Sequence, residues 1–128
     1  MISDLPSYLK MAAAEPFKWG ETDCCMFLAD WIRWKHAKDL ASEFLGRYHS
    51  QRGAQLLIKR EGGVIALLDK RLLAAGFPRT KAPVSGDAGV IITPLGETAA
   101  ICTETGWVFK SAGGLIAGKP PAAASWKL

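Results

Sequence analysis

Hydrophobic and polar positions change their spacing about halfway along this 128-residue chain. Up to about Gly76, apolar residues recur every three or four positions, as on an amphipathic helix. After that point they stand in short runs that are rich in β-branched and aromatic residues. The pattern predicts an α+β protein in which N-terminal helices pack on a C-terminal antiparallel β-sheet. At this length we expect a single domain that spans residues 1–128.

Four helices are predicted in the first half, each with a polar cap or a glycine or proline at its end. The predicted helices are a short one through Ala14, capped by Ser3 or Asp4 and ended by Pro16; one from Cys24 to about Lys38, capped by Thr22 or Asp23; one through Arg60, capped by Ser50; and one from Val64, after Gly62-Gly63, to the stop at Gly76.

The second of these helices should be the buried one, because its first half, CCMFLADWI, is apolar on nearly every side. Its predicted buried face packs against the middle of the sheet. The residues expected at this contact are Cys25, Phe27, Leu28, Trp31 and Ile32 on the helix and Val90, Ile92, Ile101 and Val108 on the sheet.

The strands are predicted from four short segments separated by turn residues at 94–96, 105–106 and 113–114. Their connections are too short for crossover helices, so neighbouring strands should be antiparallel. The final segment, ASWKL, can add an edge strand. The four segments are AGVIIT (88–93), TAAICT (98–103), WVFK (107–110) and GLIAG (114–118).

The cysteine count and spacing argue against cross-links and zinc. Three cysteines are an odd number, and adjacent cysteines such as Cys24 and Cys25 lack the spacing of paired zinc ligands. We therefore expect no metal and no cofactor. The N-terminal segment lacks the pattern of a signal peptide, and no apolar run is long enough to span a bilayer. We expect no membrane partner.

The charge of the chain is unevenly distributed. The formal net charge is +4, and residues 46–81 hold eight basic residues against Glu61 and Asp69. A basic face can attract nucleic acid, anionic polymers or an acidic protein, although a solvated helix surface is the simpler interpretation. No aromatic residue lies between Gln51 and Gly76, so the stacking platform of a single-strand binder is absent. We expect no nucleic-acid partner.

The two adjacent cysteines raise the question of chemistry. Cys24 directly follows the predicted cap Asp23, and the N–H groups and dipole of a helix N-terminus stabilise a thiolate. Cys24 can therefore be a nucleophile, but free cysteine is also among the most buried residue types. Both interpretations stay open for Cys24, whereas Cys25 is expected to pack in the core.

These residues are part of a wider resemblance. Trp19-Gly20, then Asp23-Cys24 opening a buried helix, then Gly86-Asp87 opening an antiparallel sheet, is similar to the NlpC-type papain-like cysteine peptidases. Those enzymes cleave peptide or amide bonds, commonly in bacterial cell-wall peptides. The resemblance implies a papain-like, NlpC-type fold over the whole chain.

The closer resemblance is to small phage and prophage proteins related to these peptidases, whose members tend to be encoded among tail genes. The resemblance implies a role in the tail or in its assembly. It rests on PFKWGETDCC (16–25), GRY (46–48), GA (53–54), GD (86–87), GL (114–115) and Trp126, which occur in the same order.

Carried onto this chain, the resemblance gives Cys24 the place of the nucleophile and makes Trp19, Gly20, Asp23, Gly86 and Asp87 structural. The peptidases also need a histidine base on a strand after the Gly-Asp pair and a polar residue that orients it. These two places fall at Thr98, or a neighbour, and near Lys110. No histidine follows His49 in the sequence.

Other residues are poor substitutes for the missing base. His36 stands twelve residues after Cys24, about 18 Å along a helix, which is beyond hydrogen-bond reach. His49 would need a loop that folds back. Glu97 and Glu104 border the expected strand, but an exposed carboxylate with a pKa of about 4 is a poor match for a thiol near 8.5.

The sequence therefore favours a non-catalytic phage or prophage tail protein, at the tail tip or in tail assembly, on a degenerate peptidase scaffold. The alternative is an active cysteine peptidase or amidase that acts on cell-wall peptides through Cys24. A nucleic-acid binder is a third hypothesis that rests on charge alone. The favoured hypothesis expects other tail proteins as partners, with cell-wall peptide as a further ligand. It places the protein in the virion after assembly in the host cytoplasm.

Overall fold

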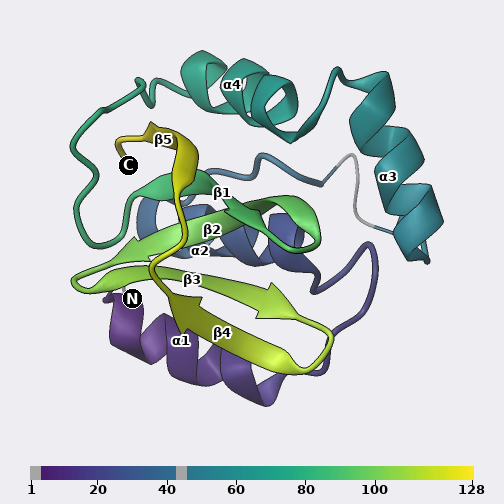
Figure 1. Cartoon of the computed structure of the whole chain (residues 1–128), viewed down its shortest axis with the longest axis horizontal. Helices are drawn as coiled ribbons and strands as arrows, with labels where there is room; N and C mark the ends of the chain where they lie inside the picture. Colours follow the sequence, from purple (N-terminus) through teal and green to yellow (C-terminus); the bar gives the residue numbers. More distant parts are fainter. Residues whose placement is uncertain (1–3, 43–45) are drawn as a thin grey trace.

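A computed structural model describes residues 4–42 and 46–128, with the helices first and the sheet after them (Figure 1). This order and the antiparallel pairing of the strands confirm the predicted α+β class. The helices are α1 (Leu5–Ala14), α2 (Cys24–His36), α3 (Gln51–Arg60) and α4 (Val64–Ala74); the strands are β1 (Ala88–Thr93), β2 (Gly96–Thr103), β3 (Gly106–Ser111), β4 (Gly114–Gly118) and β5 (Ala122–Trp126).

The five strands form one sheet in the order β4-β3-β2-β1-β5. The first four make a meander whose turns lie where glycine and proline predict them. β5 then returns to pair with β1, which confirms that the C-terminal segment adds an edge strand. The β1–β5 pairing shifts its register between Val90 and Ile91. Such a bulge bends an edge strand locally.

The helix boundaries follow the polar caps in the sequence. The side chains of Asp4, Asp23 and Ser50 each accept a hydrogen bond from a backbone N–H in the first turn of α1, α2 and α3. α2 ends at His36, two residues before the predicted end, because Ala37 adopts a left-handed conformation with φ of 57°. Ser3, the alternative cap of α1, lies outside the described residues.

The main core lies between α2 and one face of the sheet, behind β2 and β3 in Figure 1. Phe27, Leu28, Trp31 and Ile32 are buried on α2, and Cys25 is partly buried beside them. Val90, Ile101 and Val108 are buried on the strands as predicted, and together these residues form one apolar cluster.

The prediction for Ile92 is wrong. Its side chain is 43% exposed, although it lies on the same face of β1 as Val90. The reason is its position near the end of the strand, where it pairs with the exposed Glu97 just before the β1–β2 turn. The strand pattern gives the correct face, but α2 does not reach this end of it.

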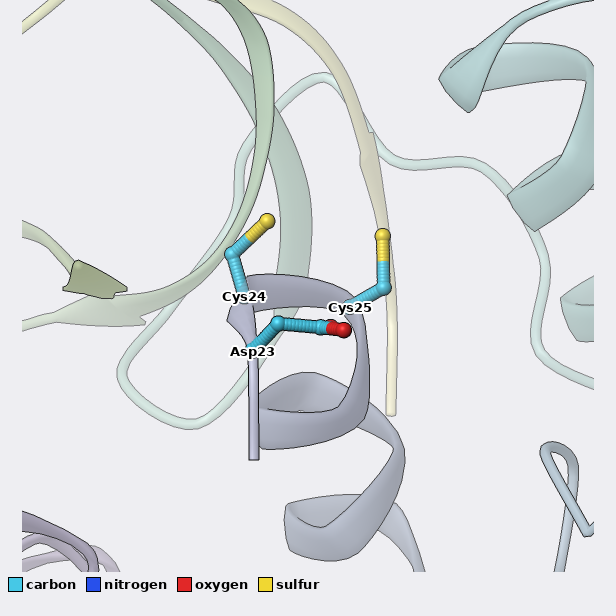
Figure 2. Close-up of side chains that lie close together, drawn as sticks. All are labelled: Asp23, Cys24 and Cys25. Carbon is cyan, nitrogen blue, oxygen red and sulfur yellow. The ribbon is translucent and has the colours of Figure 1, made fainter. Parts of the chain in front are cut away.

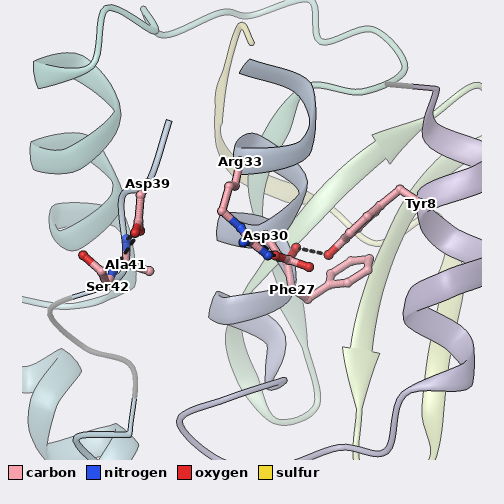
Figure 3. Close-up of polar contacts among 7 residues, drawn as sticks. All are labelled: Tyr8, Phe27, Asp30, Arg33, Asp39, Ala41 and Ser42. Atoms are coloured by element: carbon pink, nitrogen blue, oxygen red, sulfur yellow. Dashed lines mark hydrogen bonds and ion pairs between the residues drawn. The ribbon is translucent and has the colours of Figure 1, made fainter. Parts of the chain in front are cut away.

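α1 closes the core through aromatic contacts with α2. The Tyr8 ring stacks on Phe27 with centroids 5.5 Å apart and lies 5.4 Å from Trp31. Its hydroxyl donates a 2.6 Å hydrogen bond to the carbonyl of Phe27 (Figure 3), and burial raises its pKa. On the exposed side of α2, Asp30 forms an ion pair with Arg33.

The opposite face of the sheet has a smaller cluster of Ile91, Ala100, Cys102 and Trp107. The Trp107 ring lies over β1, where a Cβ on Gly89 would come within 2.4 Å of it. Small residues on β1 and β2 therefore make room for a tryptophan that spans them.

α3 and α4 form an arm at the edge of the molecule (Figure 1). α4 contributes Val64, Leu67 and Leu72 as buried residues. α3 buries only Ala54, and Leu56 on this helix is 55% exposed. We call residues 51–74, which contain both helices, the α3–α4 arm.

Candidate functional site

The turn that leads into α2 is built around Gly20. This glycine has a φ of +81°, and a Cβ at this position would lie 2.1 Å from the carbonyl oxygen of Tyr48. Gly20 is therefore required both by its conformation and by a close backbone approach. Trp19 packs against the cluster of Met26, Tyr48 and Ala54. Its ring lies edge-on to that of Phe17, with the ring centroids 4.8 Å apart.

Asp23 fixes the start of the helix from within the protein. Its side chain is 1% exposed and accepts hydrogen bonds from the backbone N–H of Gly20 (2.8 Å) and Met26 (3.1 Å) and from the hydroxyl of Tyr48 (2.5 Å). Both carboxylate oxygens are therefore used, and the residue is structural. Burial and the Asp23 charge raise the pKa of Tyr48.

The contact between Asp23 and Tyr48 is the part of this site that sequence reasoning missed. Tyr48 belongs to the GRY segment of the resemblance, but nothing in its neighbourhood indicates a partner 25 residues away. The segment also donates a backbone hydrogen bond, from the N–H of Gly46 to the carbonyl of Gly20 (3.0 Å). Residues 46–48, which follow α2 in the sequence, thus stabilise the turn before α2 through these hydrogen bonds.

Cys24 and Cys25 follow as the first two residues of α2, and each is half-buried. Figure 2 shows both sulfurs pointing away from the body of the helix, on the same side of its first turn. The two sulfurs and a carboxylate oxygen of Asp23 all lie within 4.8 Å of one another. The Cys25 side chain therefore lies close to the thiol of Cys24 as well as to the core.

The environment shifts the pKa values of the Cys24 and Cys25 thiols in opposite directions. The pKa of the Cys24 thiol lies below its usual value, chiefly because the Cys25 thiol donates a hydrogen bond to it. The backbone N–H of Ala99 acts in the same direction, while burial and the charge of Asp23 oppose the shift. Donating this hydrogen bond, together with burial, raises the pKa of Cys25. Cys24 is the thiol that ionises first.

Thr98 does not face Cys24. Along β2, Ala99 and Ile101 belong to the core beneath α2, whereas Ala100 and Cys102 belong to the cluster on the opposite face. Because side chains alternate along a strand, Thr98 lies on the face away from the helix, where its hydroxyl is 3.2 Å from that of Thr93. The residue of β2 that lies against Cys24 on this face is Ala99.

Lys110 does face the helices. It lies two residues after Val108 on β3, so continuing the Ile101–Val108 pairing brings it opposite Ala99. The side chain is 3% exposed, and its Nζ donates a 2.8 Å hydrogen bond to the carbonyl of Ala12 at the end of α1. Burial lowers the pKa of Lys110, against the opposing effect of Glu15 and Asp30. The residue joins the sheet to α1.

Among the described residues, none of the candidate substitute bases belongs to the group of donor atoms around Cys24. His36 is the last residue of α2, at the opposite end of the helix from Cys24, with its ring centroid 4.8 Å from that of Phe77. His49 and Glu104 are exposed.

Gly86-Asp87 is a structural junction. Gly86 has a φ of +95° and accepts a 2.9 Å hydrogen bond from the indole N–H of Trp31. The Asp87 carboxylate is buried and accepts backbone hydrogen bonds from Val84 (2.9 Å) and Leu128 (3.0 Å). The pair therefore joins α2, the start of β1 and the C-terminal segment.

Comparison with known proteins gives one match. The sequence profile of a family described as a domain of unknown function, DUF6950, matches residues 2–127. The chain belongs to the DUF6950 family. Neither a curated protein nor a solved structure matches it.

The eight basic residues between positions 46 and 81 of this DUF6950 domain fall into two groups. Lys70 and Arg71 lie 4.0 and 3.8 Å from Glu61, and Arg79 pairs with Asp69 at 2.8 Å. The other five are exposed; three of them lie on α3, one lies before it and one lies between α4 and β1. These exposed residues are Arg47, Arg52, Lys59, Arg60 and Lys81.

The length and composition of the helices in this DUF6950 domain show whether any of them could span a membrane. Among the described residues, no helix is both long enough and apolar enough to cross a bilayer.

Proposed function

We propose that this protein is a non-catalytic component of a phage or prophage tail, at the tail tip or in tail assembly, built on a degenerate papain-like scaffold. The observation that carries the proposal is the residue facing Cys24 from the sheet: the side that would present a base holds Ala99. An alanine side chain cannot accept the proton of a thiol or return it to a leaving amine.

The neighbouring strand supports the same conclusion. Lys110 stands opposite Ala99, at the place where the resemblance puts the residue that orients the base. Its Nζ is bound to the carbonyl of Ala12, so this side chain serves the junction between the sheet and α1. The thiol keeps a stabilising helix N-terminus, but both partners that would turn it into a hydrolytic nucleophile are replaced.

The surface of α3 supports the assembly role. Arg52, Leu56 and Lys59 recur at helical spacing, and all three are exposed. A basic helix face with an exposed leucine suits an acidic patch on another tail protein. On this proposal the partners are other tail proteins, and the protein ends in the virion after assembly in the host cytoplasm.

A second candidate function is an active cysteine peptidase or amidase that acts on cell-wall peptides. The lowered pKa of the Cys24 thiol favours it, because a thiolate is the nucleophilic form. In this case Cys24 would attack the carbonyl carbon, and the proton for the leaving amine would come from the Cys25 thiol or from solvent.

One pair of assays on three proteins separates the two functions. The assays measure cleavage of cell-wall peptides and assembly of infectious tails by wild type, Cys24→Ser and Cys102→Ser. The last variant is the control, because it changes a thiol on the other face of the sheet. We expect no cleavage by any of them and near-normal assembly with all three. Cleavage by wild type and Cys102→Ser but not by Cys24→Ser would establish the peptidase.

A further inference from the structure

The first turn of α2 places two thiols close together. Cys24 and Cys25 are adjacent in sequence, yet their sulfurs lie within 4.8 Å of each other on the same side of the turn (Figure 2). Two thiols at one place are not required by packing, since the buried residues of this helix are all large and apolar. The pair has the composition of a thiolate site for a soft cation.

The surroundings exclude a site with four ligands. Asp23 contributes the third donor atom of the group, but both of its oxygens already accept hydrogen bonds from Gly20, Met26 and Tyr48. Among the described residues, no further histidine, cysteine or carboxylate joins the group. Tetrahedral zinc, which uses four ligands in structural sites, is therefore a poor fit.

A cation that binds two ligands fits well. Two metal–thiolate bonds of about 2.3 Å in a line span about 4.6 Å, and the two sulfurs, which lie within 4.8 Å of each other, are close enough to share one cation. Thiolates select Cu(I) among the common metals. We propose that Cys24 and Cys25 form a two-coordinate site for a soft monovalent cation of the Cu(I) class.

The helix and the sheet would stabilise the loaded site. Two thiolates and one monovalent cation carry a net charge of −1, which the free N–H groups at the start of α2 favour and the neighbouring Asp23 carboxylate opposes. The backbone N–H of Ala99 lies against the Cys24 sulfur from the side of the sheet. Cys25 also lines an apolar cavity that is shared with α3 and α4, and such surroundings disfavour strongly hydrated hard cations.

This site is independent of the proposed function. It needs neither catalysis nor a tail partner, and it concerns a kind of metal that the zinc-ligand spacing of the sequence does not address. The expectation of no metal rests on that spacing, which is a rule for four-coordinate sites.

The test is an anaerobic titration of the purified, reduced protein with Cu(I), in competition with a coloured Cu(I) chelator. The matched variants are Cys24→Ser and Cys25→Ser, each of which leaves one thiol, and Cys102→Ser, which keeps both site thiols. We expect one equivalent of Cu(I) in wild type and in Cys102→Ser. The affinity of the two site variants should fall by more than the roughly 10–100-fold that the loss of an outer-shell partner causes.

Two results would overturn the proposal. One is binding that survives in Cys25→Ser, since a single thiol would then be enough. The other is the absence of competition by wild type at any chelator concentration while far-ultraviolet circular dichroism shows a folded protein. A parallel titration with Zn(II) should show at least tenfold weaker binding than Cu(I); equal or tighter binding of Zn(II) would show that the site recruits more than two ligands.

Discussion

α2 and α3 are both amphipathic helices of similar length, but the protein uses them in opposite ways. α2 has five buried residues among thirteen and lies between the sheet and α1. α3 buries Ala54 alone and turns charges and a leucine to the outside. The first helix is held in place by packing against the sheet and α1, whereas the second is held by a narrow contact with its neighbours.

This contrast shows where sequence changes are constrained. On α2, the core restricts the size and shape of the buried residues, and the packed helix holds the thiols of Cys24 and Cys25 in place. On α3, the outer face makes no contribution to the core, so its basic residues are free to serve another purpose. We expect mutations on α2 to affect stability and mutations on the outer face of α3 to affect contacts with partners.

The largest difference should appear when leucine is removed from each helix. Leu28 on α2 is 1% exposed and Leu56 on α3 is 55% exposed. Leu28→Ala should reduce the free energy of unfolding by about 2–5 kcal/mol, since it empties a core site. Leu56→Ala should change it by less than about 0.5 kcal/mol. Denaturant melts measure both, and similar losses for the two variants would refute the contrast.

The next effect concerns the turn that positions α2. Gly20→Ala should destabilise the protein by more than the roughly 1–3 kcal/mol of backbone strain alone, because the new Cβ would meet the carbonyl oxygen of Tyr48. Gly46→Ala is the matched control: φ is +72° there, and nothing lies within 4 Å of an added Cβ. Thermal melts should place Gly20→Ala clearly below the control, and equal melting temperatures would mean that the close approach is relieved without cost.

A smaller and pH-dependent effect should come from the link between the α3–α4 arm and the sheet. Asp69 on α4 accepts hydrogen bonds from Arg79 (2.8 Å) and from the indole of Trp126 (3.0 Å), and these lower its pKa below the usual 3.8. A lowered folded-state pKa stabilises the protein above the unfolded value, and this contribution disappears as the pH falls through the folded value.

Asp69→Asn should therefore destabilise the protein at neutral pH, and the difference from wild type should shrink as the pH falls below about 4. Melts across the acid range measure this convergence. Parallel profiles, with a constant difference at every pH, would show that the charge of Asp69 makes no contribution.

The smallest effect on stability should come from the outer face of α3. The double variant Arg52→Glu with Lys59→Glu should change the free energy of unfolding by less than about 0.5 kcal/mol, because both side chains are exposed. Its incorporation into assembled tails should nevertheless fall sharply, as measured by the yield of infectious particles. Lys119→Glu, an exposed charge near the sheet, is the control and should assemble normally. Normal assembly of the double variant would remove α3 from the proposed interface.

The sequence predicts most of the fold because its signals are local. Asp23 and Ser50 cap the starts of α2 and α3, and glycines mark the turns between strands. Ile92 is misjudged because the strand pattern gives its face but not the reach of the helix above it. A pattern along one strand carries no information about where its covering helix stops.

The site is less predictable because it depends on register and on distant contacts. A shift of one residue moves every side chain of a strand to the other face, so the step from Thr98 to Ala99 changes which residue faces the thiol. The hydrogen bond from Tyr48 to Asp23 joins positions 25 residues apart. The proximity of the two sulfurs depends on side-chain rotamers, which the residue types alone do not specify.

The packing of α2 directly on β2 and β3 has a consequence for how the chain folds. The segment between them, which contains α3 and α4, is a loop whose ends must meet before the core can form. The entropy of closing a loop grows only logarithmically, so doubling its length costs about 0.6 kcal/mol. Extra residues inserted at Gly62-Gly63 should therefore leave the folding rate and the core nearly unchanged, and the arm can lengthen or shorten while the first turn of α2 keeps its geometry.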